Sequence, residues 1–382
     1  MVFDFLQPLS KSFTEYLDSL SVQCLGKKIT FHTKSDFPNL ETISVAIIGV
    51  NEFRGSNKEN SSDSLEGFRK VLYRLFPGNW NVSIADLGNI EAGESLNDTY
   101  FLVQTICEDL LRKKIVPIVI GGSQDLSYPL YRSFDGLDQM VNFVSVDNKF
   151  DISKENSNLA DSFLTNIIVE EPNNLFNYSN IGFQTYFNSQ EEIDLMDKLY
   201  FEAYRLGEVS NNLTVAEPVL RDADIVSVDM TSVQSSFSGN FQEFNPNGFT
   251  GKEICALSRY AGISDKVSVF GVFNFNDTLV EYNLVAQVVW YFFEGYSFRS
   301  NEYPFGSKEN YLKYTVIIDD DELVFYKSDK TSRWWIEIPI LTNVNNKLKR
   351  NTLLPCSYND YLASCEGEMP ERWWKAQRRN IV

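Results

Sequence analysis

Histidine is almost absent from this sequence: His32 is the one imidazole among 382 residues. Imidazole is the usual side chain for proton transfer near neutral pH and a common ligand of catalytic metals. Enzymes that need it as a ligand or a base usually need more than one. Because no motif surrounds His32, we interpret it as a surface residue or a satisfied core residue.

Positive charge, paired cysteines and long apolar runs are also scarce. The 34 basic side chains are outnumbered by 52 acidic ones, and the formal charge of −18 disfavours nucleic acid as a partner. The five cysteines show no short paired spacing, which predicts reduced thiols rather than a zinc site or a disulfide framework. No apolar run approaches a membrane span, and the N-terminus lacks the pattern of a signal peptide, so we expect a cytoplasmic location.

Hydrophobic residues make up 43% of the chain, enough for a sizeable core. From about residue 43, short apolar runs alternate with longer helical patterns, which is typical of a parallel sheet built from strand-helix-strand units. Near-continuous apolar runs predict buried strands at 43–50, 82–87, 115–120, 141–146, 225–228 and 267–273. Helical spacing predicts helices at 65–76, 99–112 and 191–206.

These patterns divide the chain into three regions. We expect residues 1–42 to pack on the core, residues 43–300 to form the α/β domain, and residues 301–382 to form a β-rich extension. Within the extension, apolar runs predict antiparallel strands at 311–318, 323–326 and 334–338. The tail at 372–379 is basic and aromatic, which is typical of packing on the chain's own β segment, of a protein contact or of an anionic membrane surface.

Polar side chains follow three of the predicted strands. Ligands of open parallel sheets bind outside the carboxyl ends of the strands, and the long polar loops 51–64 and 232–249 are predicted to lie over this edge. Singly, each aspartate could cap a turn or end a strand. Together they predict a site. The side chains are Gln124 after the strand at 115–120, Asp147, Lys149 and Asp151 after 141–146, and Asp229 and Thr231 after 225–228.

The strand ends resemble those of the arginase, agmatinase and formimidoylglutamase family. The matching segments, in the family's order, are Ile-Gly-Val at 48–50, Asp-Leu-Gly at 86–88, Gly-Gly-Ser-Gln-Asp at 121–125, Asp-Asn-Lys-Phe-Asp at 147–151, Asp-Met-Thr at 229–231, Pro246 to Glu253 and Phe-Asn at 275–276. The resemblance covers roughly residues 43 to 295. It implies a three-layer α/β/α fold around an eight-stranded parallel sheet, with two manganese ions held by histidines and aspartates.

Four positions depart from the family's pattern. By the resemblance, Gln124 and Lys149 stand where histidine ligands are expected, Thr231 stands where an aspartate is expected, and Asn274 replaces the glutamate that would hold a guanidino group. The three aspartates remain and, with Gln124, would surround one metal position. The second position loses both ligands that are its own.

Lys149 is the most informative of these replacements. A protonated lysine cannot ligate a metal but can neutralise carboxylates, so we expect no cofactor and a salt bridge between Lys149 and the three aspartates. The alternative is one hard ion, Mn²⁺, Mg²⁺ or Ca²⁺, held by Asp147, Asp151, Asp229 and the Gln124 carbonyl.

The leading hypothesis is therefore a catalytically inactive arginase-fold protein that acts by binding a protein partner, a second copy of itself or a ligand. The alternative is a divergent ureohydrolase that cleaves a C–N bond in a linear amidine or guanidino compound with a single metal. A third possibility is a sensor that binds an arginine-like ligand without turnover, although Lys149 and Asn274 weigh against it.

Overall fold

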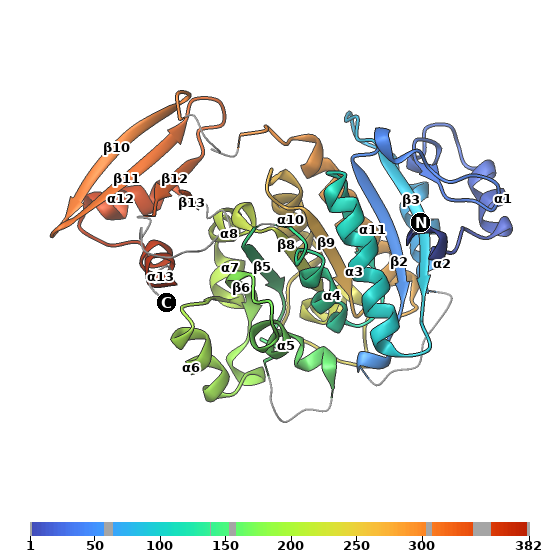
Figure 1. Ribbon diagram of the computed structural model, residues 1–382, viewed down its shortest axis with the longest axis horizontal. Coiled ribbons are helices and arrows are strands. Elements are labelled where there is room, and N and C mark those ends of the chain that lie inside the picture. The colour runs from blue at the N-terminus through green and yellow to red at the C-terminus, as the bar shows by residue number, and fades with distance from the viewer. Residues whose placement is uncertain are drawn as a thin grey trace.

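The computed structural model describes residues 2–56, 64–137, 139–152, 158–302, 308–338 and 353–379. Its centre is a nine-stranded sheet in the order β1-β3-β2-β4-β9-β8-β5-β6-β7, and every neighbouring pair in it is parallel (Figure 1). The strands are β1 Thr30–Phe31, β2 Val45–Asn51, β3 Ile84–Glu91, β4 Val116–Ile120, β5 Val141–Val146, β6 Leu175–Phe183, β7 Glu202–Arg205, β8 Ile225–Asp229 and β9 Val269–Phe273.

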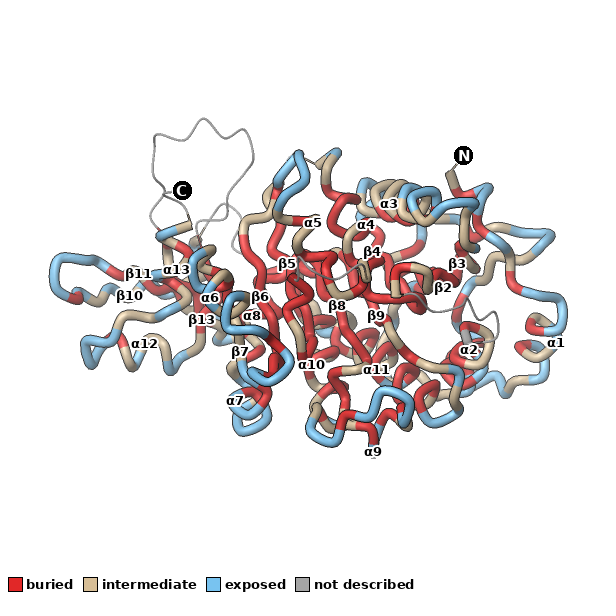
Figure 2. Tube along the Cα trace, turned by 90° about the horizontal axis from the view of Figure 1, so that it is seen from below, coloured by how far each residue is buried: buried red, intermediate tan, exposed pale blue. Residues whose placement is uncertain are grey.

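Helices cover both faces of this sheet, because its strands are apolar on both sides. One hydrophobic cluster joins it to α1 Lys11–Ser19, α2 Ser64–Arg74, α7 Leu206–Asn211, α8 Ala216–Asp222, α10 Gly251–Ile263 and α11 Leu279–Ser297. A second cluster joins its other face to α3 Leu96–Arg112, α4 Ser127–Arg132, α5 Phe163–Val169 and α6 Gln190–Lys198. Figure 2 shows the central strands β4, β5, β8 and β9 buried between these layers. The expected three-layer α/β fold is confirmed.

The sheet has nine strands where eight were expected. The extra strand, β1, comes from the N-terminal segment, where Thr30 and Phe31 pair with Ala85 and Asp86 of β3. The same segment buries Phe13 and Leu17 in the hydrophobic cluster on the α11 side. The N-terminal segment thus extends the sheet as well as packing on it.

One predicted helix is wrong. The stretch 191–206 was expected to be a single helix, but α6 ends at Lys198 and the chain then forms the edge strand β7. The six predicted inner strands are present, and β6 and β7 are additional. Short 3-10 turns complete the fold: η1 Val2–Phe5, η2 Leu25–Lys27, η3 Leu40–Thr42, η4 Arg54–Ser56, η5 Gln124–Leu126, η6 Leu159–Asp161, η7 Thr185–Phe187, η8 Leu213–Val215 and η9 Met230–Ser232, with helix α9 at Ser235–Ser238.

The C-terminal extension forms a separate antiparallel sheet in the order β10-β11-β12-β13, as its β-rich sequence predicts. Its elements are β10 Tyr311–Ile318, β11 Asp321–Ser328, β12 Trp334–Glu337, β13 Leu353–Cys356, α12 Tyr358–Cys365 and α13 Glu371–Arg379. Figure 1 shows it on the side of the molecule where α7, α8 and β6 lie.

Two adjacent tryptophans of β12 face opposite ways, and other elements cover both. Trp334 stacks on Tyr361 of α12, with ring centroids 4.8 Å apart. The guanidinium of Arg221, on α8, lies 4.7 Å from the ring centre of Trp335. In the tail, Trp373 is buried and its indole N–H donates to the Glu337 carbonyl at 2.7 Å. The tail therefore packs on the chain's own β segment.

Candidate functional site

The structure brings the predicted site residues together at the carboxyl edge of the central strands. A cavity of about 390 Å³ opens there, lined among others by Gln124, Lys149, Asp151, Asp229, Thr231 and Asn274. The sheet order explains why these residues meet. Strands β4, β9, β8 and β5 are neighbours, and each contributes residues at or just after its last position. Asp147 is buried beside the cavity, and its Oδ1 accepts the backbone N–H of Lys149 at 2.9 Å.

The backbone around the cavity turns sharply. Gly121 and Gly122 have φ of 95° and 77°, and a Cβ on Gly122 would come within 2.6 Å of the Glu52 carbonyl oxygen. Glycine is therefore required where the chain leaves β4. The Gly122 carbonyl accepts the N–H of Asn274 at 3.0 Å, which ties the ends of β4 and β9 together. Asp151 and Asn274 also adopt positive φ, 53° and 58°, which asparagine and aspartate tolerate better than most residues.

Both oxygens of the Asp229 carboxyl group already have partners. Oδ1 accepts the backbone N–H of Thr231 at 2.7 Å, and Oδ2 accepts the side-chain amide of Asn274 at 2.8 Å. Burial raises the pKa of Asp229 to about 8, with a further contribution from the charge of Asp147. The amide of Asn274 thus occupies the side of Asp229 that a cation would otherwise contact.

Asp147 and Asp151 are less well satisfied. Oδ2 of each is buried without a hydrogen-bond partner among the described residues. Burial raises the pKa of both groups, and the neighbouring charge of Asp147 raises the pKa of Asp151 further. The two carboxyls therefore lie close enough to share a hydrogen bond, which favours a proton on Asp151.

Lys149 does not pair directly with the three aspartates, and in this respect the prediction is wrong. Its Nζ lies 3.2 Å from Oδ1 of Asp161, and its side chain is 45% exposed at the cavity wall. Burial lowers the pKa of Lys149, but Asp161 and then Asp151 outweigh it, so the net shift is upward. The ammonium reaches Asp147 and Asp151 only through longer-range attraction. Asp161 is anchored in turn by the Asn158 amide at 2.9 Å.

Other residues of the cavity carry no clear signal in the sequence. Asn148 donates to the Thr231 carbonyl at 3.2 Å, while its Oδ1 is buried without a partner among the described residues. Phe187 and Phe244 line the cavity from the loops after β6 and after α9. The polar composition of the loop at 232–249 predicts that it lies over the carboxyl edge of the sheet, but it does not predict that an aromatic ring of this loop lines the cavity.

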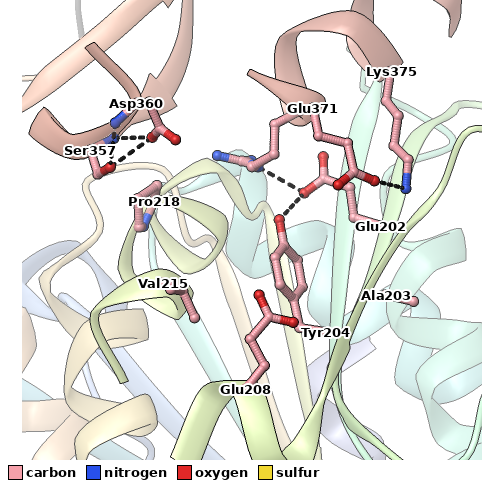
Figure 3. A pocket seen from close by; sticks show the side chains of 11 residues that line it. Glu202, Ala203, Tyr204, Glu208, Val215, Pro218, Ser357, Asp360, Glu371 and Lys375 are labelled. Atoms are coloured by element: carbon pink, nitrogen blue, oxygen red, sulfur yellow. Dashed lines mark hydrogen bonds and ion pairs between the residues drawn. The ribbon is translucent and has the colours of Figure 1, made fainter. Parts of the chain in front are cut away.

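A second hollow, of about 240 Å³, lies between β7 and the C-terminal extension (Figure 3). Four of its charged groups are paired with one another. Glu202 accepts from Arg372 at 2.8 Å and from the Tyr204 hydroxyl at 2.9 Å, and Lys375 pairs with Glu371 at 2.8 Å. Since the pair of Glu202 and Arg372 joins β7 to α13, we interpret this hollow as part of the interface that fixes the extension to the core.

The comparisons with known proteins agree with this architecture. The sequence matches the model of the arginase family over residues 44–291, so the chain belongs to the arginase family. No curated protein matches it. Within the described residues, no helix is long and apolar enough to cross a membrane.

Solved structures with the same fold include ureohydrolases. Trypanosoma cruzi formiminoglutamase with Mn²⁺ superposes with a TM-score of 0.62 at 18% identity, covering 69% of this chain and 100% of that one. Formimidoylglutamase from Bacillus subtilis gives 0.60 at 17%, covering 71% and 91%. The agmatine ureohydrolase of Thermoplasma volcanium gives 0.57 at 17%, covering 75% and 97%. At these identities the likeness concerns the fold.

The residues at the strand ends do not fit the two-manganese centre that the family implies. Within the described parts of the chain, no group of three or more histidine, cysteine, aspartate or glutamate side chains is arranged to hold a metal. Each oxygen of Asp229 accepts a hydrogen bond from an N–H group, and Lys149 and Thr231 offer no carboxylate or imidazole. Of the three strand-end aspartates, Asp147 and Asp151 each keep one buried carboxyl oxygen without a donor among the described residues.

Proposed function

We propose that this chain is a catalytically inactive member of the arginase family that works by binding. The observation that carries the proposal is the hydrogen bond from the Asn274 amide to Asp229, which holds an N–H group where the best-placed metal-ligand candidate would face a cation. A ureohydrolase would need that carboxylate for a cation. Lys149, whose ammonium pairs with Asp161 at the cavity wall, cannot act as a metal ligand while it is protonated.

A divergent ureohydrolase is the second candidate. The unpartnered oxygens of Asp147 and Asp151 favour it, because they leave room for one hard ion, Mn²⁺, Mg²⁺ or Ca²⁺. Its substrate would be a linear amidine or guanidino compound, and Asn274 would lie in the substrate pocket.

One experiment separates the two candidates. The full chain is purified, its metal content is measured by mass spectrometry, and release of urea or formamide from guanidino and formimino compounds is followed with and without added Mn²⁺. We expect no stoichiometric metal and no turnover. Turnover that disappears in Asp229→Ala would show that the chain is an enzyme.

A protein partner or self-association fits the binding role best. The charge of −18 argues against nucleic acid. Contact of the tail at 372–379 with a membrane surface has little support, because Trp373 is buried and Arg372 and Lys375 bond to the core at Glu202 and at the Phe201 carbonyl. The cysteines of the described residues are free, which supports the cytoplasm as the compartment.

A further inference from the structure

The two edges of the C-terminal sheet differ in what covers them. Along β13, the Cys356 carbonyl accepts from Arg221 at 2.8 Å and the Pro355 carbonyl accepts from Arg372 at 2.6 Å, so this edge faces α8 and α13. At the other edge, β10 pairs with β11 alone among the strands that the structure describes. Figures 1 and 2 show β10 in the part of the extension that points away from the central sheet.

The hydrogen bonds of the β10–β11 hairpin show which backbone groups of β10 point outward. The N–H of Asp329 donates to the Asn310 carbonyl at 3.2 Å, in the register of the two strands. In an antiparallel pair, residues that face the partner strand alternate with residues that face away from it. Even-numbered residues of β10 therefore face β11, and the N–H and carbonyl groups of Lys313, Thr315 and Ile317 point outward.

Large apolar side chains are exposed beside this edge. Leu312 is 49% exposed and Ile317 is 74% exposed. Leu312 shares its face of the sheet with Tyr314, whose ring lies 5.4 Å from that of Tyr361 on α12, and Ile317 lies on the opposite face. A strand added at this edge would cover both apolar side chains in part and would pair with the outward backbone groups.

The hairpin carries opposite charge at its two ends. The turn and the residues that follow it are acidic: Asp319, Asp320, Asp321 and Glu322. Near the other end, Lys313 is exposed and pairs with no carboxylate of the described residues. Lys308 is already paired with Glu337 at 3.2 Å. The remaining charges at that end cancel, because Lys327 and Lys330 are matched by Glu309 and Asp329. Lys313 is thus the uncompensated cation of β10.

This charge pattern is complementary to itself in an antiparallel arrangement. With a two-fold axis at Val316, Lys313 of each copy lies directly opposite Asp319 of the other. With the axis at Thr315, the same two residues are diagonal neighbours on one face, a distance that long side chains span. Both registers pair outward-facing residues with one another. A lysine on an edge strand usually discourages pairing, but here the acidic turn of a second copy neutralises it.

We propose that β10 is a self-association edge, at which two copies of the chain pair antiparallel and join their C-terminal sheets into one continuous sheet. The interface is isologous, because the same strand serves both copies. The inference names a second copy as the partner of the proposed binding function and in this respect rests on that function. The pairing itself uses no residue of the strand-end cavity.

Sedimentation of the full chain as a function of concentration tests the proposal. Physiological ionic strength is needed, because two chains of charge −18 repel each other at long range when salt is low. We expect a reversible equilibrium between monomer and dimer. Thr315→Pro removes an outward N–H and leaves the bonds to β11 in place, since proline is tolerated where an edge strand faces solvent. We expect it to raise the dimer Kd by roughly tenfold or more while the urea midpoint stays unchanged.

A charge exchange tests the antiparallel register and covers the case in which Thr315→Pro unfolds the hairpin. We expect Lys313→Glu and Asp319→Lys each to raise the dimer Kd by roughly tenfold, and the double variant to restore it. Lysine tolerates the φ of 51° at position 319, because Lys114 has a φ of 59°. Within one copy the two positions are roughly 20 Å apart, so the rescue must come from the second copy. Lys252→Glu, at an exposed position of α10, is the matched control and should leave the Kd unchanged.

Three results would overturn the β10 pairing: a chain that stays monomeric at every concentration, a dimer that a folded Thr315→Pro variant keeps, or charge variants without rescue. The urea and formamide assay on the same protein keeps the two proposals apart. If neither dimer nor turnover is found, the β10 pairing fails and the inactive-enzyme proposal stands. If the dimer behaves as expected and turnover is found, the proposed function fails and the β10 pairing stands.

Discussion

At the scale of single residues, the site is governed by how carboxyl groups are compensated when no cation is beside them. Asp229 is satisfied by two N–H donors, yet burial still raises its pKa to about 8. Its neighbours Asp147 and Asp151 have fewer donors and their pKa values are raised as well. Near neutral pH such a group binds a proton more readily than it does in water, which lowers the negative charge of the cluster.

Asn274→Asp is the substitution that tests this balance. The new carboxylate would face Asp229 where the amide now donates at 2.8 Å. We expect unfolding free energy to fall by about 2 kcal/mol at pH 8, because a hydrogen bond is replaced by repulsion. The folded-state pKa values of the pair would lie above the unfolded ones, so the penalty is present at high pH and shrinks as pH falls through them. Urea denaturation between pH 8 and pH 5 measures it.

The same variant also tests the capacity of the site for metal. An added carboxylate beside Asp229 gives a hard cation the oxygen ligands that the wild type withholds. We expect Mn²⁺ or Ca²⁺ to raise the melting temperature of Asn274→Asp but not that of the wild type. Asn211→Asp, at the exposed end of α7, adds the same charge elsewhere and should show no metal effect. If Mn²⁺ or Ca²⁺ raised the melting temperature of the wild type equally, the claim that its site does not fit a metal would be wrong.

The sequence predicts these site residues unequally. Asp147, Asp151 and Asp229 are visible because each follows an apolar run whose end must lie at one edge of the sheet. The partner of Lys149 is not visible, because Asp161 reaches it through tertiary packing: its turn, η6, lies against η4 and η5. The same holds for the aromatic rings of the cavity wall, Phe187 and Phe244, which come from two loops far apart in the chain.

At the scale of elements, one buried carboxylate holds helix α13 to the edge strand β7. Glu202 accepts from Arg372 at 2.8 Å and lies 3.5 Å from Arg379. Burial alone would raise the pKa of Glu202, but Arg372 and Arg379 outweigh it and lower the pKa to about 2. The helix is thus attached to the core by an ion pair that water hardly reaches.

Glu202→Gln should therefore destabilise the chain by roughly 3 kcal/mol, since it removes the carboxylate that both buried guanidinium groups share and leaves Arg372 only Asp222 as an acidic partner among the described residues, at 3.8 Å. The native pKa is depressed, so this stabilisation is present above the ordinary value of 4.5 and is lost as pH falls toward 2. The difference between wild type and variant in urea denaturation should shrink over that range. Glu208→Gln, an exposed acid lining the same hollow, is the control and should have little effect at any pH.

Adjacent tryptophans offer a second test of the same helix. Trp373 is 1% exposed and belongs to the core of the extension, whereas Trp374 is 37% exposed. We expect Trp373→Ala to lower the unfolding free energy by about 3–5 kcal/mol and Trp374→Ala by less than about 1 kcal/mol. Comparable losses for the two variants would mean that the helix does not pack as described.

Strands β6 and β7 were not predicted from the sequence, and the reason is the same for both: neither is a continuous apolar run. β6 carries Asn177, Ser179 and Asn180, whose burial is made possible by hydrogen bonds such as those from Asn177 to Glu202 and from Asn180 to the Lys149 carbonyl. A pattern based on apolar runs cannot see such a strand. β7 is four residues long and begins with a buried glutamate, so it resembles the end of the preceding helix.

At the scale of the whole molecule, the C-terminal extension lies against the β7 end of the central sheet, so α13 covers an edge that would otherwise be open. An exposed edge strand is a template for pairing with other chains, and natural proteins usually cover or charge it. Helix α13 both covers the edge and places charged side chains beside it. Arg372 and Arg379 pair with Glu202, and Lys375 bonds to the Phe201 carbonyl just before β7.

Truncation after residue 302 should therefore harm the core more than any single change in α13. The shortened chain would keep Glu202 in β7 without Arg372 or Arg379, and it would also expose the apolar surface that the extension covers. We expect it to associate through the uncovered edge and to unfold at lower urea than Glu202→Gln, as measured by light scattering and by denaturation at low concentration. Adding Glu202→Gln to the truncated chain should then recover stability, because the carboxylate it removes has lost both guanidinium partners and keeps only the neutral donors Tyr204 and Asn177. A truncated chain that stays monomeric and gains nothing from Glu202→Gln would show that the extension is not the cover of this edge.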